Sequence, residues 1–218
     1  MKLKLLELFA GSRSWGKQAE KLGFEVFSTD INNYPDIDLV KDIRDITPND
    51  IPFIPTHIVA SPPCTTFSVA SIGHHWNIDN TPKTYEAILG VQIVQITINL
   101  IMHYLELDPG IKFYIENPRG KLRKLDVIKN VFPRATVWYC KYNDEYKRAK
   151  PTDIWSNNIT NLFNPNGWNP KPVCYNNNFN CNHEKAIRSN KDKGTQGMNK
   201  DITRSSIPAE LCKEILIS

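Results

Sequence analysis

One cysteine, Cys64, lies where a nucleophile could act. It closes the tetrapeptide Ser61-Pro62-Pro63-Cys64, directly after the apolar run 56–60, which predicts a buried strand. Two consecutive prolines cannot continue that strand, so the chain must turn and present Cys64 near the strand's carboxyl end. In open α/β sheets, this edge binds ligands and carries chemistry. The residue is therefore either a nucleophile or, like most free cysteines, a small buried hydrophobe.

A carboxylate follows another predicted strand. The apolar run 111–115 ends at Glu116-Asn117-Pro118. Because the carboxyl ends of parallel strands meet at one edge of a sheet, Glu116 could lie near Cys64. Together they would supply a nucleophile and a general acid. Without the cysteine, an exposed loop glutamate would be the simpler interpretation.

The first strand-to-helix turn, Phe9-Ala10-Gly11-Ser12, has the character of a ligand-binding turn because it directs backbone N–H groups over a helix start. Asp30 ends the next strand, at the spacing from Gly11 where an acid holds a ribose hydroxyl. The turn lacks the full glycine pattern of a dinucleotide site, which favours a nucleoside cofactor without phosphates. Asp42 could accept from an adenine amino group. Either acid alone could equally cap a helix or end a strand.

These residues need a scaffold of alternating strands and helices. Hydrophobic periodicity predicts strands at 3–9, 24–29, 38–40, 56–60 and 111–115, and helices at 13–22, 82–107 and 208–217. This alternation predicts an α/β fold with a doubly wound, mostly parallel sheet. The 82–107 helix is apolar nearly all round but carries too many polar residues for a membrane span, so we expect a central core helix.

Composition sets broad limits on the chain. It has 218 residues, 40% of them hydrophobic, and a formal net charge of +4. That mildly basic balance permits a polyanionic partner without requiring one. Five cysteines without disulfide-scaffold spacing indicate a reducing compartment, and the N-terminus leads directly into a strand pattern. We therefore expect a cytoplasmic protein, in the host cell if the chain is phage-encoded.

The motifs together resemble the DNA (cytosine-5) methyltransferases. Phe-Ala-Gly at 9–11, an acid at 30, Asp42-Ile43, Pro-Pro-Cys at 62–64 and Glu-Asn at 116–117 occur in that family's order and spacing. Residues 139–155 resemble its strand with a basic active-site residue, and 194–208 its closing segment. The resemblance covers nearly the whole chain and is closest to compact members encoded by bacteriophages and prophages. It implies a Rossmann-like, S-adenosylmethionine-dependent methyltransferase fold.

The resemblance also implies roles for individual residues. Cys64 would add as a thiolate to C6 of cytosine, which requires a lowered thiol pKa. Glu116 would protonate N3, and Arg148, or alternatively Lys150, would be the basic residue beside them. S-adenosylmethionine would contact Phe9, Ala10, Gly11, Trp15, Asp30, Ile31, Asp42 and Ile43. The cytosine, flipped out of double-stranded DNA, would contact Pro63, Ser68, Asn117 and Lys150, under a mobile loop at 65–82.

The region 158–203 differs in texture from the rest. It is rich in Asn, Pro, Lys and Gly and has no sustained period. We expect a small target-recognition region there, with 1–157 plus 204–218 forming the catalytic domain, as a monomer or weak dimer. It contains three potential soft metal ligands, Cys174, Cys181 and His183. A structural zinc site needs four, and although Cys140 or His57 could approach, no clean fourth is visible. We therefore expect no metal.

Departures from the family pattern leave alternatives open. Arg13-Ser14-Trp15 stands where most of the family has Gly-Gly. A minority branch of the family acts on tRNA, so the same chemistry on RNA is one alternative. A non-catalytic nucleic-acid-binding relative is another, although it would have no need to keep both Cys64 and Glu116. A phage-type enzyme could protect its genome from host nucleases, as in restriction-modification, but only analogy supports this.

Overall fold

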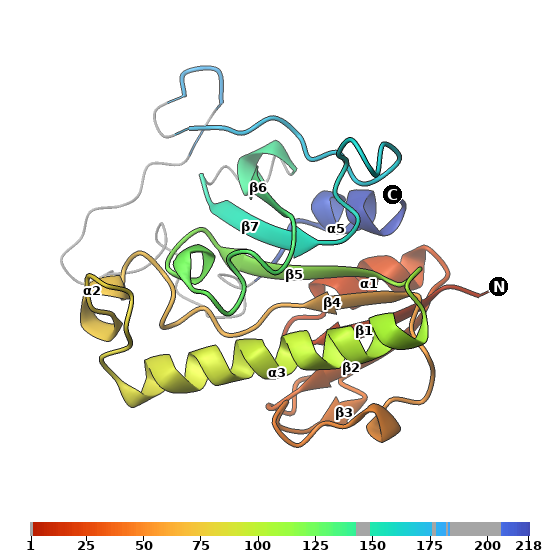
Figure 1. The fold of residues 1–218 in the computed structure, drawn as a ribbon. Coiled ribbons are helices and arrows are strands. Elements are labelled where there is room, and N and C mark those ends of the chain that lie inside the picture. Colours follow the sequence, from red (N-terminus) through yellow and green to blue (C-terminus); the bar gives the residue numbers. More distant parts are fainter. Residues whose placement is uncertain (1, 143–148, 176–177, 182, 184–205) are drawn as a thin grey trace.

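The computed structural model describes residues 2–142, 149–175, 178–181, 183 and 206–218. Its described part contains a seven-stranded sheet of order β3-β2-β1-β4-β5-β7-β6 (Figure 1). The strands are β1 Lys4–Leu8, β2 Glu25–Asp30, β3 Leu39–Val40, β4 His57–Ala60, β5 Lys112–Pro118, β6 Arg134–Trp138 and β7 Pro151–Ser156. Neighbours from β3 to β5 pair in parallel, whereas β7 pairs antiparallel with both β5 and β6. The predicted fold class is confirmed.

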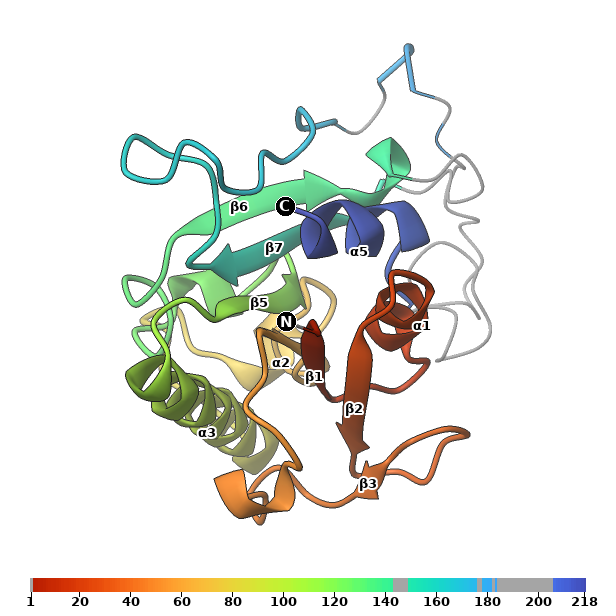
Figure 2. The same cartoon turned by 90° about the vertical axis from the view of Figure 1, so that its right-hand side faces the viewer.

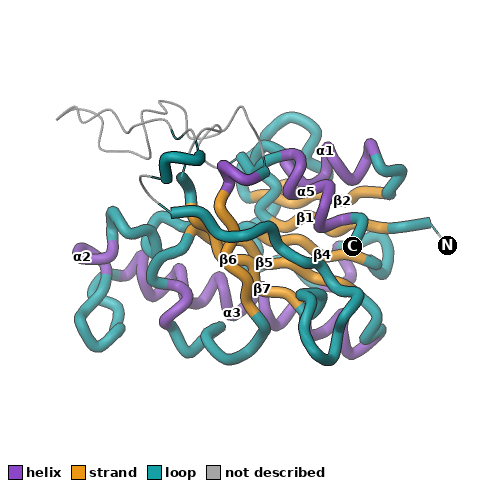
Figure 3. The backbone as a smooth tube through the Cα atoms, turned by 90° about the horizontal axis from the view of Figure 1, so that it is seen from above, coloured by secondary structure: helices purple, strands orange, loops and turns teal. Residues whose placement is uncertain are grey.

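Helices cover both faces of the sheet. Helix α3 covers one face, and α1 and α5 lie side by side on the other (Figure 2). The view from above shows the same layers around the strands (Figure 3). The helices are α1 Ser14–Lys21, α2 Ile72–His75, α3 Tyr85–Leu107 and α5 Ala209–Leu216, with 3-10 turns η1 Pro48–Asp50, η2 Leu122–Lys124 and η3 Tyr139–Lys141. This arrangement is doubly wound and Rossmann-like.

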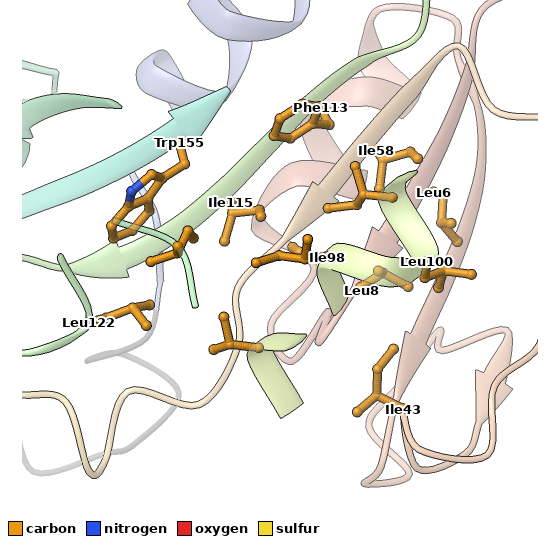
Figure 4. Packing of buried hydrophobic residues seen from close by; sticks show 14 of the residues in the cluster. Leu6, Leu8, Ile43, Ile58, Ile98, Leu100, Phe113, Ile115, Leu122 and Trp155 are labelled. Carbon is orange, nitrogen blue, oxygen red and sulfur yellow. The ribbon is translucent and has the colours of Figure 1, made fainter. Parts of the chain in front are cut away.

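Alternation along the strands builds two hydrophobic cores. Successive side chains point to opposite faces, so in β1 Leu6 joins the α3 core and Leu5 the α1–α5 core. The α3 core is shown in Figure 4, where Ile58, Phe113 and Ile115 from the strands lie near Ile98. On the other face, the core includes Val59, Tyr114, Trp15, Leu211 and Ile215. Both faces are covered, as a mostly parallel sheet requires.

Helix α3 begins later than predicted and packs differently. It starts at Tyr85 rather than Pro82 because the Thr84 side chain caps it, accepting the Ala87 N–H at 3.3 Å. Its length and hydropathy alone would suit a membrane span, but it lies along the sheet. It does not pass through the centre of the core, because Ile88 and Met102 are 43% and 40% exposed.

The sequence pattern did not predict β6, and β5 runs further than expected. The predicted strand 111–115 continues to Pro118 because β7 pairs with it as far as the Pro118–Thr152 pair. Glu116 and Asn117 thus lie within a strand and not in a loop after it. Since β7 is antiparallel, it begins at the edge where β5 and β6 end, and this brings its first residues to the predicted site.

Candidate active site

The turn after β1 is conformationally unusual. Phe9, Gly11 and Arg13 all have positive φ, at 58°, 48° and 55°. For the two that are not glycine, this left-handed region costs about 1–2 kcal/mol each. Arg13 is held there by an ion pair from its Nη2 to Glu20 Oε1 at 2.6 Å. The left-handed backbone at position 13 gives a physical reason why glycine would suit this turn.

Asp30 lies beside this turn and is already oriented. Its Oδ2 accepts the Gly11 N–H at 2.9 Å and its Oδ1 accepts the Asn32 N–H at 2.8 Å. Oδ1 also accepts a hydrogen bond from Asn32 Nδ2 at 3.4 Å, so it is Oδ2 that keeps a further lone pair for a ligand hydroxyl. The next residue, Ile31, is 62% exposed and offers an apolar surface. Ala10 is buried and donates its N–H to the Thr29 carbonyl. A carboxylate beside an apolar surface fits the ribose and adenine of a nucleoside.

Two residues predicted to contact the cofactor, Trp15 and Ile43, lie in the hydrophobic cores. The Trp15 side chain is 2% exposed in the α1–α5 core, and Glu7 Oε1 already accepts the Trp15 N–H at 3.1 Å. Ile43 is buried in the α3 core (Figure 4). We therefore withdraw Trp15 and Ile43 as side chains that line a cofactor. Asp42 is partly exposed, and hydrogen bonds from Arg44 lower the pKa of its carboxyl.

The Cys64 turn is fixed to β5. The pairing of Ala60 with Ile115 sets Ser61 beside Glu116 in the register. The next β5 residue, Asn117, is fully buried and donates from Nδ2 to the Pro62 carbonyl at 2.9 Å. Asn117, predicted as a substrate contact, thus holds the Pro-Pro-Cys turn against the strand that carries Glu116.

Replacing Asn117 by alanine is expected to destabilise the fold by about 1–3 kcal/mol, because the buried Pro62 carbonyl loses its donor. Chemical denaturation of the wild type and of Asn117→Ala would measure this loss. The control is Asn99→Ala on the exposed side of α3, where only a small change is expected. Equal stability of the two variants would contradict a structural role for Asn117.

Glu116 is a buried carboxyl with a defined partner. It is 6% exposed, and its Oε1 accepts a hydrogen bond from the Tyr139 hydroxyl at 2.8 Å. Burial raises the pKa of Glu116, and the charge of Lys150 and the hydrogen bond from Tyr139 offset part of this rise. The net direction of the pKa shift is upward, which favours the protonated carboxyl.

Lys150 is the basic residue that the structure brings to this pair. It directly precedes β7, and its carbonyl accepts the Tyr139 N–H at 3.2 Å. Its Nζ lies 4.8 Å from the centroid of the Tyr139 ring. The Lys150 charge lowers the pKa of both Cys64 and Glu116. Arg148, our first choice from the sequence, lies outside the described residues, so its role stays a prediction.

The Cys64 thiol does not have the lowered pKa that a preformed thiolate needs. Burial raises its pKa, the negative charge of Glu116 raises it further, and Lys150 offsets only part of the rise. The thiolate is therefore disfavoured while Glu116 is ionised.

Tyr139 is a site residue to which the sequence assigned no role. Tyr139→Phe is expected to move the pKa of Glu116 further upward, because the hydrogen bond that favours the carboxylate is lost. In an NMR titration, the carboxyl signal of Glu116 should titrate at higher pH than in the wild type, with a stability loss of about 1 kcal/mol. An unchanged titration would show that Tyr139 does not tune Glu116. Tyr142→Phe, which leaves the Glu116 contact in place, is the control.

The predicted mobile loop at 65–82 is anchored from within. Trp76 donates from Nε1 to the Thr66 carbonyl at 2.7 Å and stacks on Phe67. Ser68 pairs its hydroxyl with that of Ser71 at 2.9 Å, while Pro63 is exposed. A groove of about 300 Å³ lies between this loop and α3, and none of the predicted site residues line it. Closure of the loop over DNA stays a prediction.

No protein-family model matches this chain, and no curated protein matches its sequence. Among solved structures, it resembles the Entamoeba histolytica methyltransferase EhMeth over 72% of this chain and 53% of that one, with 14% identity and a TM-score of 0.47. The S. pombe Dnmt2 methyltransferase matches with 17% identity and a TM-score of 0.46, covering 72% of this chain and 49% of its own. The chain thus spans about half the length of both. Such low TM-scores assign neither a family nor a substrate, so the functional proposal rests on the site itself.

Proposed function

We propose that this chain is an S-adenosylmethionine-dependent methyltransferase that modifies C5 of cytosine in double-stranded DNA. The observation that carries the proposal is the convergence of Cys64, Glu116 and Lys150 at one sheet edge. Cytosine is a poor carbon nucleophile, so C5 accepts a methyl group only after a nucleophile adds to C6 and N3 gains a proton. A thiol and a protonated carboxyl are suited to these two tasks.

In the proposed reaction, the Cys64 thiolate adds to C6 while Glu116 gives its proton to N3. The electron pair of the resulting enamine makes C5 nucleophilic, and C5 takes the methyl group. Water then takes the C5 proton, the C6–sulfur bond breaks to release the Cys64 thiolate, and N3 returns its proton to the Glu116 carboxylate, which restores the aromatic ring. Lys150 stabilises negative charge on the thiolate and, later, on the Glu116 carboxylate.

The repulsion between the negative charges of ionised Cys64 and ionised Glu116 links these two tasks. Each pKa is raised, and ionised Glu116 disfavours the thiolate. Transfer of one proton from the thiol to the carboxylate would produce both reactive forms together, a thiolate and a carboxylic acid. We infer that the negative charge of the pair resides on sulfur, with Glu116 protonated, when Cys64 attacks.

The residues beside β1 and β2 fit the proposed cofactor. When bound, S-adenosylmethionine supplies an electrophilic methyl group on its sulfonium. Asp30 Oδ2 has a lone pair for a ribose hydroxyl, and Ile31 gives an apolar surface for adenine. The turn at Phe9–Arg13 orients this carboxylate through the Gly11 N–H.

Duplex DNA is the proposed partner. The target atom is inaccessible inside a duplex, so the cytosine must be flipped into the pocket. The net charge of +4 suits a phosphate backbone. We further propose that the enzyme acts in the cytoplasm, without a membrane, as a monomer or weak dimer, and that 158–203 contributes target recognition. The described residues of that region include Trp168, which is buried against the catalytic core.

Transfer of a labelled methyl group from S-adenosylmethionine to duplex DNA, compared with tRNA, tests the substrate. Label at C5 of cytosine in DNA supports the proposal. Label in tRNA alone would transfer the same chemistry to RNA. Binding of DNA and cofactor without any turnover would identify a non-catalytic relative.

A further inference from the structure

Four potential metal ligands, Cys140, Cys174, Cys181 and His183, converge on one point. One ligand atom from each lies within 4.8 Å of those of the other three. The sequence led us to expect no metal because a fourth ligand was missing. In the structure, Cys140 from η3 supplies the fourth ligand. His57 lies in β4, where its Nδ1 is hydrogen-bonded to the Thr56 hydroxyl. We propose that these four residues bind a structural zinc ion, which we call the Cys3His site.

The distances within the cluster are close to those of a zinc tetrahedron. Bond lengths of about 2.3 Å for sulfur and 2.0 Å for nitrogen place tetrahedral ligand atoms about 3.5–3.8 Å apart. His183 Nε2 lies 3.4 Å from Cys174 Sγ and 3.2 Å from Cys140 Sγ. No pair exceeds 4.8 Å, so movements of about 1 Å complete the tetrahedron around an ion.

The chemistry of the ligands favours zinc over the alternatives. Three thiols and one imidazole form a closed set of the structural type, and soft sulfur ligands select against magnesium and calcium. All of these cysteines are free, so no disulfide competes for them. Asn178 donates from Nδ2 to Cys174 Sγ at 3.2 Å, the kind of supporting hydrogen bond that surrounds metal-bound thiolates.

The ligands join two distant parts of the chain. Cys140 lies on η3 at the end of β6, while the other three span 174–183, within the proposed target-recognition region. A bound ion would cross-link this region to the edge of the sheet where Cys64 and Glu116 lie. The ion would stabilise this region, because small domains often depend on a metal for stability.

The cross-link also reaches the proposed active site. Cys140 directly follows Tyr139, whose hydroxyl donates to Glu116. Fixing Cys140 to the ion would therefore restrain the backbone that positions Tyr139. The Cys3His site itself does not depend on the proposed function, since its ligands take no part in the reaction.

The test is the zinc content of the full-length protein, measured by elemental mass spectrometry after purification without chelators. We expect about one zinc ion per chain, falling below about 0.1 in Cys140→Ser, Cys181→Ser and His183→Ala. His183→Cys should keep the ion because a fourth thiolate completes the set. Replacement of zinc by Co²⁺ should give the visible absorption of a tetrahedral thiolate complex, which disappears in Cys181→Ser.

Cys64→Ser is the matched control, since this cysteine lies outside the cluster. It should retain zinc and lose methyl transfer, which separates this inference from the proposed function. Wild-type protein that contains no zinc and gives no Co²⁺ spectrum would overturn the proposal. So would zinc that persists in both Cys140→Ser and Cys181→Ser, or a disulfide between two of these cysteines in the intact mass of protein kept under reducing conditions.

Discussion

Cys64→Ala is expected to lower methyl transfer to cytosine by at least about 10⁴-fold, because no other group can make the bond to C6 that activates C5. The measurement is single-turnover transfer from labelled S-adenosylmethionine to duplex DNA. Binding of the cofactor should persist, because Asp30 and Ile31 lie at the end of another strand, β2.

Cys212→Ser provides the comparison for Cys64. Cys212 is also free, but it is fully buried in the α1–α5 core. Its replacement should reduce stability and leave the chemical step of the folded fraction intact. Methyl transfer by Cys64→Ala at a rate near that of the wild type would remove the cysteine from the mechanism.

Glu116→Gln is expected to lower methyl transfer by about 10²–10⁴-fold, because glutamine cannot give a proton to N3. The amide oxygen can still accept a hydrogen bond from the Tyr139 hydroxyl, so the local structure should persist. Single-turnover rates and thermal unfolding of the same samples separate the two effects. The control is Glu106→Gln, at an exposed position of α3, which should change neither the single-turnover rate nor the thermal unfolding.

The difference in stability between the wild type and Glu116→Gln should depend on pH in a defined direction. Burial raises the pKa of Glu116 above its ordinary value of 4.5. The neutral carboxyl therefore favours the folded state at low pH, and this contribution is lost as the pH rises through the folded pKa. Above that pKa the variant, which cannot ionise, should be as stable as the wild type or more stable. A variant much less stable at alkaline pH would show that ionised Glu116 stabilises the fold.

Sequence periodicity predicted the parallel half of the fold well. The five predicted strands correspond to β1 through β5, and the three predicted helices to α1, α3 and α5, with Gly23 ending α1 in a left-handed conformation. These elements are apolar or amphipathic segments bounded by polar residues, glycine or proline. The sequence also placed Cys64 after β4 at its carboxyl end, whereas Glu116, predicted to follow a strand, lies within β5.

The antiparallel β7 and the strand β6 were harder to predict. Their pairing is non-local, and a strand's sequence does not show which way it runs beside its neighbour. Without knowledge of this pairing, Lys150 could be named only as an alternative, and Tyr139 received no role. The burial of Trp15 and Ile43 was also hidden, since an apolar residue beside a ligand turn can face either the ligand or the core. The fourth ligand of the Cys3His site, Cys140, lies 34 residues before Cys174 and is brought to it by tertiary structure alone.

Covalent trapping tests the central claim most directly. Duplex DNA carrying 5-fluorocytosine is incubated with wild-type protein or Cys64→Ala, with and without S-adenosylmethionine, and the products are separated under denaturing conditions. Fluorine at C5 blocks the final elimination, so the wild type should remain attached to DNA only when the cofactor is present, and Cys64→Ala should not. If the wild type binds both DNA and cofactor but forms no adduct, the proposed function is wrong.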